Sequence, residues 1–173
     1  RLAFVGTPCQ IRAIGKMRFL HIKPAHVVKY AISLFCYENF DYDKLYELLQ
    51  AETKVKPKDI KKTWIKKNFF VKDKNDREFE VNIKKLDPAV RSHCHACDDF
   101  TGKFSDISVG ASGAPKGYSM IITRNKKSHN LIHSLLSVGL IEQYEVPIEQ
   151  TKEWKTKKTN YLKKMIRLKR KKM

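Results

Sequence analysis

The sequence lacks a long apolar segment, since no uninterrupted hydrophobic run approaches the roughly 20 residues that a membrane-spanning helix requires. The longest such run, residues 31–37, is typical of a buried strand. The first residues also carry no secretory signal pattern, so we expect a cytoplasmic protein without a membrane span. The chain opens inside an apparent strand and without an initiator methionine, which indicates that an N-terminal part is missing.

Acidic residues are scarce, because 18 Asp and Glu stand against 36 Lys and Arg and leave a net charge of +18. Residues 151–173 hold eleven basic residues and one acid, Glu153. This charge raises the alternative of a basic nucleic-acid-binding protein, but no known DNA- or RNA-binding motif accompanies it. We therefore favour a solvated, lysine-rich helix and expect no nucleic-acid partner. We expect this tail to dock a partner protein or to remain solvated, without forming the active site.

Both glycine fingerprints of nucleotide-binding proteins, GxGxxG and GxxxxGK[ST], are absent. Residues 110–117 nevertheless form a glycine-bearing loop between two expected strands. Its glycines allow a ligand to approach the backbone, and its polar side chains can donate to a phosphate or a ring carbonyl. An ordinary glycine-rich turn is the alternative that the spacing leaves open. The candidate cofactor-binding residues are Gly110, Ser112, Gly113, Lys116, Gly117, Tyr118 and Ser119.

Hydrophobic periodicity predicts an α/β or α+β fold. The expected elements are a strand at 2–5, a helix at 8–20, a strand at 27–35, a helix at 41–50, two hairpin strands within 58–83 joined by a turn at 73–76, strands at 106–109 and 118–123, a helix at 127–138, and a helix from 149 onward. The first strand, helix and strand predict a right-handed βαβ unit. We therefore expect a βαβ-containing sheet flanked by helices, with a small β-hairpin region and a basic C-terminal helix. The predicted division is a domain at 1–147 and the helix at 148–173.

The four cysteines lie at sequence positions that are typical of thiolate ligands. Cys9 lies in the first turn of a predicted helix, where the free N–H groups favour a thiolate. Cys36 ends the next strand, so both thiols are expected at the carboxyl edge of a parallel sheet, where open α/β sheets bind ligands. Cys94 and Cys97 form a CxxC motif. His93 and His95 flank Cys94, and either could replace a thiolate, but we expect them at the surface or hydrogen-bonded to the sulfur ligands. The spacing alone leaves open a [4Fe–4S] cluster, structural zinc, or two buried thiols without a ligand; disulfides are disfavoured without a secretory signal.

Four ordered motifs carry a family resemblance. They are Phe-Val-Gly-Thr-Pro-Cys-Gln at 4–10, Leu-Phe-Cys-Tyr-Glu-Asn-Phe at 34–40, Cys-His-Ala-Cys-Asp-Asp-Phe-Thr at 94–101, and Ser-Asp-Ile-Ser-Val-Gly at 105–110. The chain resembles the C-terminal part of the beta subunits of coenzyme F420-reducing hydrogenase and F420-dependent formate dehydrogenase. The run Tyr-Ser-Met at 118–120 stands where that family commonly has Trp-Ser-Thr.

The resemblance implies an F420-dependent oxidoreductase subunit that carries one [4Fe–4S] cluster and one FAD. It implies that Cys9, Cys36, Cys94 and Cys97 hold the cluster and that the 110–117 loop lies beside the flavin. Hydride would pass between F420 and FAD, and single electrons would reach a hydrogenase or formate dehydrogenase catalytic subunit. No side chain is expected to act as a catalytic acid or base. A cluster-bearing docking subunit without F420 activity is the alternative.

Overall fold

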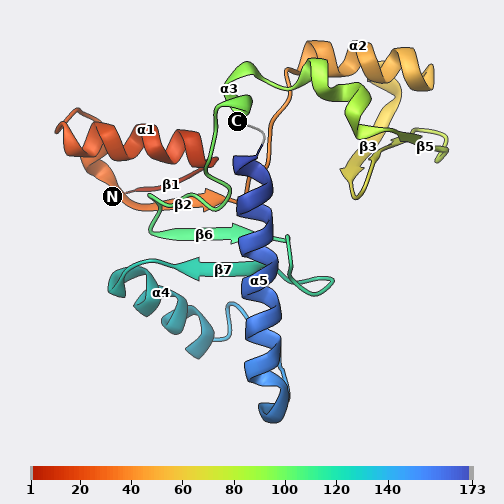
Figure 1. Cartoon of the computed structure of the whole chain (residues 1–173). Coiled ribbons are helices and arrows are strands. Elements are labelled where there is room, and N and C mark those ends of the chain that lie inside the picture. The colour runs from red at the N-terminus through yellow and green to blue at the C-terminus, as the bar shows by residue number, and fades with distance from the viewer. Residues whose placement is uncertain (1, 172–173) are drawn as a thin grey trace. The chain divides into compact units, whose positions relative to one another are not determined.

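The computed structural model describes residues 2–171, which form two compact units (Figure 1). The first unit combines the chain up to Tyr37 with the chain from Ala96 onward, and the second is Glu38–His95. The chain therefore passes between the units twice, each time beside a cysteine. The division predicted from the sequence, 1–147 and 148–173, stays a prediction. Within the described residues, no helix combines the length and the apolar character that a membrane crossing needs.

A four-stranded sheet forms the centre of the first unit, in the order β1-β2-β6-β7. Strand β2 pairs in parallel with both β1 and β6, whereas β7 is antiparallel to β6. The predicted α/β class and the βαβ unit are thereby confirmed. The elements of this unit are β1 (Leu2–Gly6), α1 (Pro8–Phe19), η1 (Ala25–Val27), β2 (Val28–Leu34), β6 (Ile107–Gly110), β7 (Met120–Thr123), α4 (Lys126–Ser137), η4 (Ile148–Gln150) and α5 (Thr151–Arg170).

Local sequence signals explain where α1 and α4 begin and end. Pro8 occupies the first turn of α1, and the N–H of Thr7 donates to Oε1 of Gln10 (2.8 Å). Asn125 caps α4 by accepting from the N–H of Ser128 (2.9 Å). Just beyond the end of α4, Gly139 has a φ of +70°, a left-handed conformation that ends helices. The predicted boundaries of both helices are confirmed to within two residues.

The Asp106 carboxylate joins several elements of the first unit just before β6. It accepts hydrogen bonds from the N–H of Ala31 (2.8 Å) and from Nδ2 of Asn125 (2.7 Å). The Lys127 ammonium lies 3.5 Å and the Arg18 guanidinium 3.9 Å from the same carboxylate. Burial acts to raise the pKa of Asp106, but these hydrogen bonds and positive charges outweigh it and leave the pKa below 3.8. The ionised carboxylate thus connects β2, α4 and α1.

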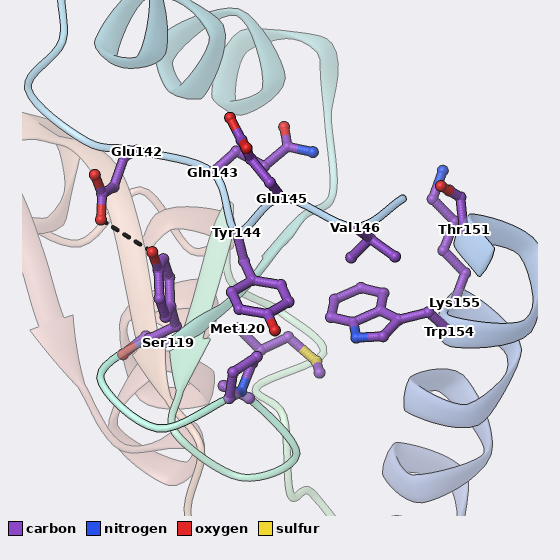
Figure 2. A pocket seen from close by; sticks show the side chains of 13 residues that line it. Ser119, Met120, Glu142, Gln143, Tyr144, Glu145, Val146, Thr151, Trp154 and Lys155 are labelled. Carbon is purple, nitrogen blue, oxygen red and sulfur yellow. Dashed lines mark hydrogen bonds between the residues drawn. The ribbon is translucent and has the colours of Figure 1, made fainter. Parts of the chain in front are cut away.

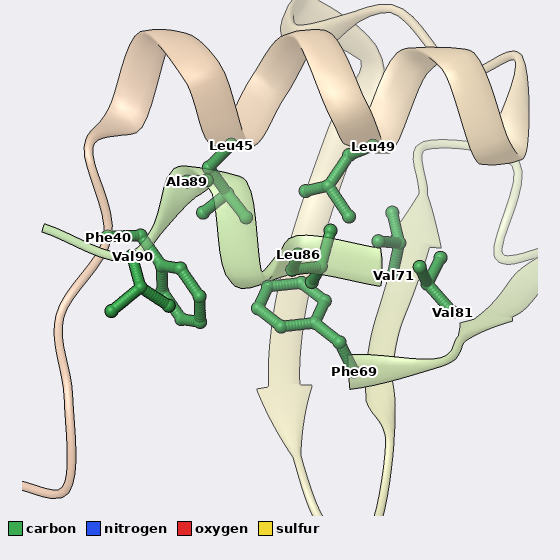
Figure 3. Packing of buried hydrophobic residues seen from close by; sticks show 9 residues of the cluster. All are labelled: Phe40, Leu45, Leu49, Phe69, Val71, Val81, Leu86, Ala89 and Val90. Atoms are coloured by element: carbon green, nitrogen blue, oxygen red, sulfur yellow. The ribbon is translucent and has the colours of Figure 1, made fainter. Parts of the chain in front are cut away.

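The second unit packs a helix against a three-stranded antiparallel sheet, in the order β3-β4-β5. Its core lies between α2, this sheet and residues 83–90, with Leu45 beside Ala89 and Leu49 beside Leu86 and Val71 (Figure 3). The Asp41 side chain caps α2 by accepting from the N–H of Lys44. The elements are α2 (Tyr42–Thr53), η2 (Pro57–Asp59), β3 (Ile60–Ile65), β4 (Phe69–Asp73), β5 (Glu78–Val81), η3 (Ile83–Ala89) and α3 (Ser92–His95).

Three sequence-based expectations need correction. Residues 58–83 hold three strands and not two, because an additional turn at 66–68 consists of two lysines and Asn68 and lacks glycine and proline. The strand expected from residue 118 begins at Met120, after the left-handed Gly117. The sequence also puts Trp154, Tyr161, Met165 and Leu168 near one apolar stripe of the last helix. In α5, however, Tyr161 and Leu168 are about 40% exposed, whereas Lys169 is buried.

The Asp106 contacts predict a pH-dependent loss of stability. We expect Asp106→Asn to lower the free energy of unfolding at pH 7 by about 1.5–3 kcal/mol, because charge-assisted hydrogen bonds are lost. The folded pKa is depressed, so this stabilisation is complete above the unfolded pKa near 3.8 and disappears as the pH falls through the folded value. Urea unfolding at pH 7 and pH 3 measures the difference. Glu47→Gln, an exposed carboxylate of α2, is the control, and an equal effect of both variants would contradict the prediction.

Candidate functional site

Cys9 and Cys36 follow the carboxyl ends of β1 and β2, which are parallel neighbours in the sheet. The predicted placement of both residues at one sheet edge is therefore confirmed. Cys9 is exposed in the first turn of α1, and its Sγ lies 3.1 Å from the Thr7 hydroxyl. Cys36 is half-buried two residues beyond β2, and its N–H donates to the Phe100 carbonyl (2.9 Å).

The CxxC motif lies where the chain returns from the second unit to the first. Cys94 belongs to α3 in the second unit, and its Sγ accepts from the N–H of Asn39 (3.3 Å). Cys97 belongs to the first unit, where its thiol donates to the Asp99 carbonyl (3.8 Å). His93 and His95 are exposed, as the sequence predicted.

The chemistry of the thiols fits a four-thiolate iron–sulfur cluster. None of the four cysteines is in a disulfide, and three are half-buried. In the part of the chain that the structure describes, no three Cys, His, Asp or Glu side chains already converge on one point to hold a metal ion. Four free thiols match the kind and number of donors that a [4Fe–4S] cluster needs. The assignment of Cys9, Cys36, Cys94 and Cys97 as its ligands stays a prediction.

The segment after the CxxC motif is held against the sheet by a polar network. The buried Asp99 carboxylate accepts from the N–H groups of Gly102 (2.8 Å) and Lys103 (2.9 Å). Gly102 has a φ of +72°, and a Cβ there would lie 2.0 Å from the Ser33 hydroxyl of β2. Only glycine fits this position, so the chain beyond Cys97 is fixed directly above β2.

Two glycines of the 110–117 loop are required by the packing of the protein itself. A Cβ at Gly110 would lie 2.2 Å from the Phe35 ring. A Cβ at Gly113, where φ is +84°, would lie 2.8 Å from the Tyr161 ring of α5. Gly117 differs, because its φ is +88° but the space beside it is open. Of the three glycines, only Gly117 leaves room for a ligand to reach the backbone.

A cavity of about 990 Å³ lies beside this loop (Figure 2). Two predicted residues, Tyr118 and Ser119, contribute to its wall, as do Ala114 and Pro115 from within the loop. The other five candidate residues are not part of the wall. The remaining lining residues are Met120, Glu142, Gln143, Tyr144, Glu145, Val146, Thr151, Trp154 and Lys155.

Three aromatic side chains, Tyr118, Tyr144 and Trp154, contact one another in a row along the wall of this cavity. The Tyr118 and Tyr144 rings meet edge to face at 5.1 Å, and Tyr144 stacks on Trp154 at 6.1 Å with an interplanar angle of 16°. The Tyr118 hydroxyl donates to Glu142 (3.1 Å), and this bond, with the charge of the carboxylate, raises the pKa of Tyr118. The ammonium of Lys158 lies 5.3 Å from the Trp154 ring centre. The cavity thus combines flat aromatic faces with charges of both signs.

Helix α5 contributes to this region in ways that the sequence did not predict. Thr151, Trp154 and Lys155 line the cavity, Tyr161 packs on Gly113, and Lys169 reaches the end of β2. The expectation of a solvated tail is therefore wrong for the buried Lys169, whereas docking to a partner and a place outside the active site stay predictions. The available signal was the pair of aromatic residues, Trp154 and Tyr161, within an otherwise lysine-rich segment.

Comparison with known proteins places most of the chain in one family. The family model for the C terminus of the beta subunit of coenzyme F420 hydrogenase/dehydrogenase matches residues 1–149. A coenzyme F420 hydrogenase beta subunit of Methanococcus voltae is 32% identical over 148 residues, covering 82% of this chain and 51% of that protein. An uncharacterized protein of Methanocaldococcus jannaschii is 39% identical over 131 residues, covering 73% of this chain and 36% of that protein. The chain thus spans roughly a third to a half of these relatives.

A solved structure shares the fold. A chain of the F420-reducing NiFe hydrogenase complex from Methanosarcina barkeri superposes with a TM-score of 0.74 and 24% identity. The match covers 95% of this chain and 58% of that chain. At this identity the likeness shows the fold alone.

The packing of the glycine loop predicts different costs at two left-handed glycines. Gly113→Ala and Gly117→Ala both strain the backbone, but only Gly113→Ala also forces the Tyr161 ring of α5 to move. We expect Gly113→Ala to lower the free energy of unfolding by about 1–3 kcal/mol more than Gly117→Ala, from overpacking. Urea unfolding measures both variants, and combining Gly113→Ala with Tyr161→Ala should remove the excess. Equal costs at the two glycines would contradict the packing described for Gly113.

Proposed function

The chain belongs to the family formed by the carboxyl-terminal region of coenzyme F420 hydrogenase/dehydrogenase beta subunits, and from this we propose that it transfers electrons between F420 and a partner hydrogenase or formate dehydrogenase. When bound, FAD would exchange a two-electron hydride for single electrons, and a [4Fe–4S] cluster would carry those electrons one at a time. The protein's part is to bind, orient and shield these groups. The observation that supports this most is the position of Cys9 and Cys36 at the ends of parallel neighbouring strands.

The proposed cluster ligands are Cys9, Cys36, Cys94 and Cys97. Two of them have a local feature that suits a bound thiolate. The free N–H groups at the start of α1 favour negative charge at Cys9, and the N–H of Asn39 already donates to the Cys94 sulfur. Cys97 precedes the segment that Asp99 and Gly102 fix against the sheet. The contacts of Cys94 with Asn39 and of Asp99 with Gly102 are present without a bound metal.

The proposed flavin site is the cavity lined by Tyr118, Tyr144 and Trp154. Its volume lies at the upper end of the range for cofactor and ligand pockets. Tyr144 and Trp154 offer flat faces for an isoalloxazine ring, and Ser119 offers a hydroxyl. Lys155 supplies positive charge for an anionic group, whereas Glu142 disfavours a phosphate at its own end of the cavity. Of the predicted flavin contacts, those of Tyr118 and Ser119 fall on the wall of this cavity. Ser112, Lys116 and Gly117 lie outside the wall, and their contacts with the flavin stay predictions.

The net positive charge of the chain suits an anionic coenzyme. F420 carries a phosphate and a glutamate tail, so a basic surface raises its local concentration at low ionic strength. This contribution is screened over about 8–10 Å at physiological salt. It therefore accelerates encounter with the coenzyme and does not determine specificity.

Metal analysis tests the cluster. Chain prepared without oxygen should contain about four iron and four acid-labile sulfide atoms. Cys36→Ala should lose most of both, because one thiolate is removed, whereas His93→Ala should retain them as an exposed neighbour of the motif. Recovery of one zinc atom and no sulfide would contradict the proposal.

Titration with reduced F420 tests the function in the complex that contains this chain. Reduced F420 should bleach the flavin absorbance, and a cluster-bearing docking subunit without F420 activity would show no bleaching. Trp154→Ala should weaken FAD binding roughly threefold to tenfold, through the lost stacking, with iron content unchanged. Trp64→Ala removes the other tryptophan, which stacks on Phe70 in the second unit, and serves as the control. Unchanged FAD affinity in Trp154→Ala would place the flavin elsewhere.

A further inference from the structure

Lys169, in the last turn of α5, is the largest fully buried side chain among the described residues. It is only 2% exposed, and it forms no ion pair within that part of the chain. Lysine is rarely buried to this extent without an acidic partner, because removing an ammonium ion from water is costly. A buried, charged group of this kind requires an explanation beyond the packing of a surface helix.

The Lys169 ammonium binds the backbone where β2 ends. Its Nζ donates to the carbonyl of Cys36 (2.8 Å) and to the carbonyl of Tyr37 (2.7 Å). On the other side of the same peptide segment, the N–H of Cys36 donates to the Phe100 carbonyl. The backbone of Cys36 is therefore fixed through both its N–H and its carbonyl. Tyr37 is also the last residue of the first unit before the chain enters the second.

Two carbonyl groups offset only part of the cost of burying this ammonium, because they carry no net charge. An anion nearby would offset the rest, and Cys36 is one of the proposed thiolate ligands. A four-thiolate cluster is anionic and becomes more negative when it accepts an electron. A fixed positive charge beside one of its ligands would therefore favour the reduced form and raise the reduction potential.

We propose that Lys169 is a positioning residue that fixes Cys36 for cluster binding and supplies a buried positive charge beside it. The second part of this inference rests on the proposed function, whereas the first concerns the backbone alone. The family model ends at residue 149, so Lys169 lies on an element outside the matched region. Through the hydrogen bonds of Lys169, helix α5 would form part of the site at the sheet edge.

Hydrogen–deuterium exchange tests the positioning role without any cofactor. Lys169→Met removes both hydrogen bonds and the charge while keeping a similar side-chain length. We expect amide exchange in residues 36–38 to accelerate at least tenfold, with the amides of β1 unchanged. Lys163→Met, an exposed lysine of the same helix, should leave both regions as they are. Unchanged exchange at 36–38 in a folded Lys169→Met protein would overturn the positioning role.

A redox titration followed by electron paramagnetic resonance tests the charge in anaerobically prepared, cluster-containing protein. Lys169→Met should shift the midpoint potential to a more negative value, and Lys169→Arg, which keeps the charge, should restore it toward that of the unchanged chain. If Lys169→Met does not fold, Lys169→Gln keeps one donor without the charge and should show the same negative shift. Equal potentials in the unchanged chain and a charge-free variant would overturn the charge role. Absence of iron from the unchanged chain would instead refute the proposed function and with it the charge role, and exchange would still decide the positioning role.

Discussion

Parallel pairing of β1, β2 and β6 is the constraint on which the rest of the first unit depends. Parallel strands all end at the same edge, so the segments that leave them are brought together whatever their separation in sequence. Cys9 follows β1, Cys36 follows β2, and the glycine loop follows β6. Each of these segments is then held by local contacts of its own, because sheet pairing fixes the strands but not the loops that follow them.

Helix α5 supplies part of this local restraint along the edge. From its N-terminus to its C-terminus it places Trp154 in the cavity, Tyr161 against Gly113 and Lys169 against the carbonyl of Cys36. Twenty residues of helix span about 30 Å, enough to reach from the 142–146 segment to the end of β2. One rigid element therefore contacts the proposed flavin region and the segment that bears a proposed cluster ligand.

The sequence predicted the features that local chemistry encodes. Thr7 and Pro8 mark the start of α1, Gly139 marks the end of α4, and period-2 alternation identifies most strands. The turn at Asn68 was missed because two lysines precede it and no glycine or proline marks it. Lys169 was missed for a deeper reason. Hydrophobic periodicity assigns charged residues to the surface, and only the folded chain shows that two carbonyls meet this ammonium.

The difference between exposed and buried lysines determines how the basic charge of the tail can act. Eleven basic residues in 151–173 give a large count, but exposed ammonium groups are hydrated and their fields are screened by salt within about 10 Å. Such groups influence encounter and solubility, and they contribute little to a buried site. A single ammonium held out of water, as at Lys169, acts across a medium of low polarity and is screened much less. The proposed role of Lys169 therefore depends on its burial, and the net charge of the segment is a poor guide to that role.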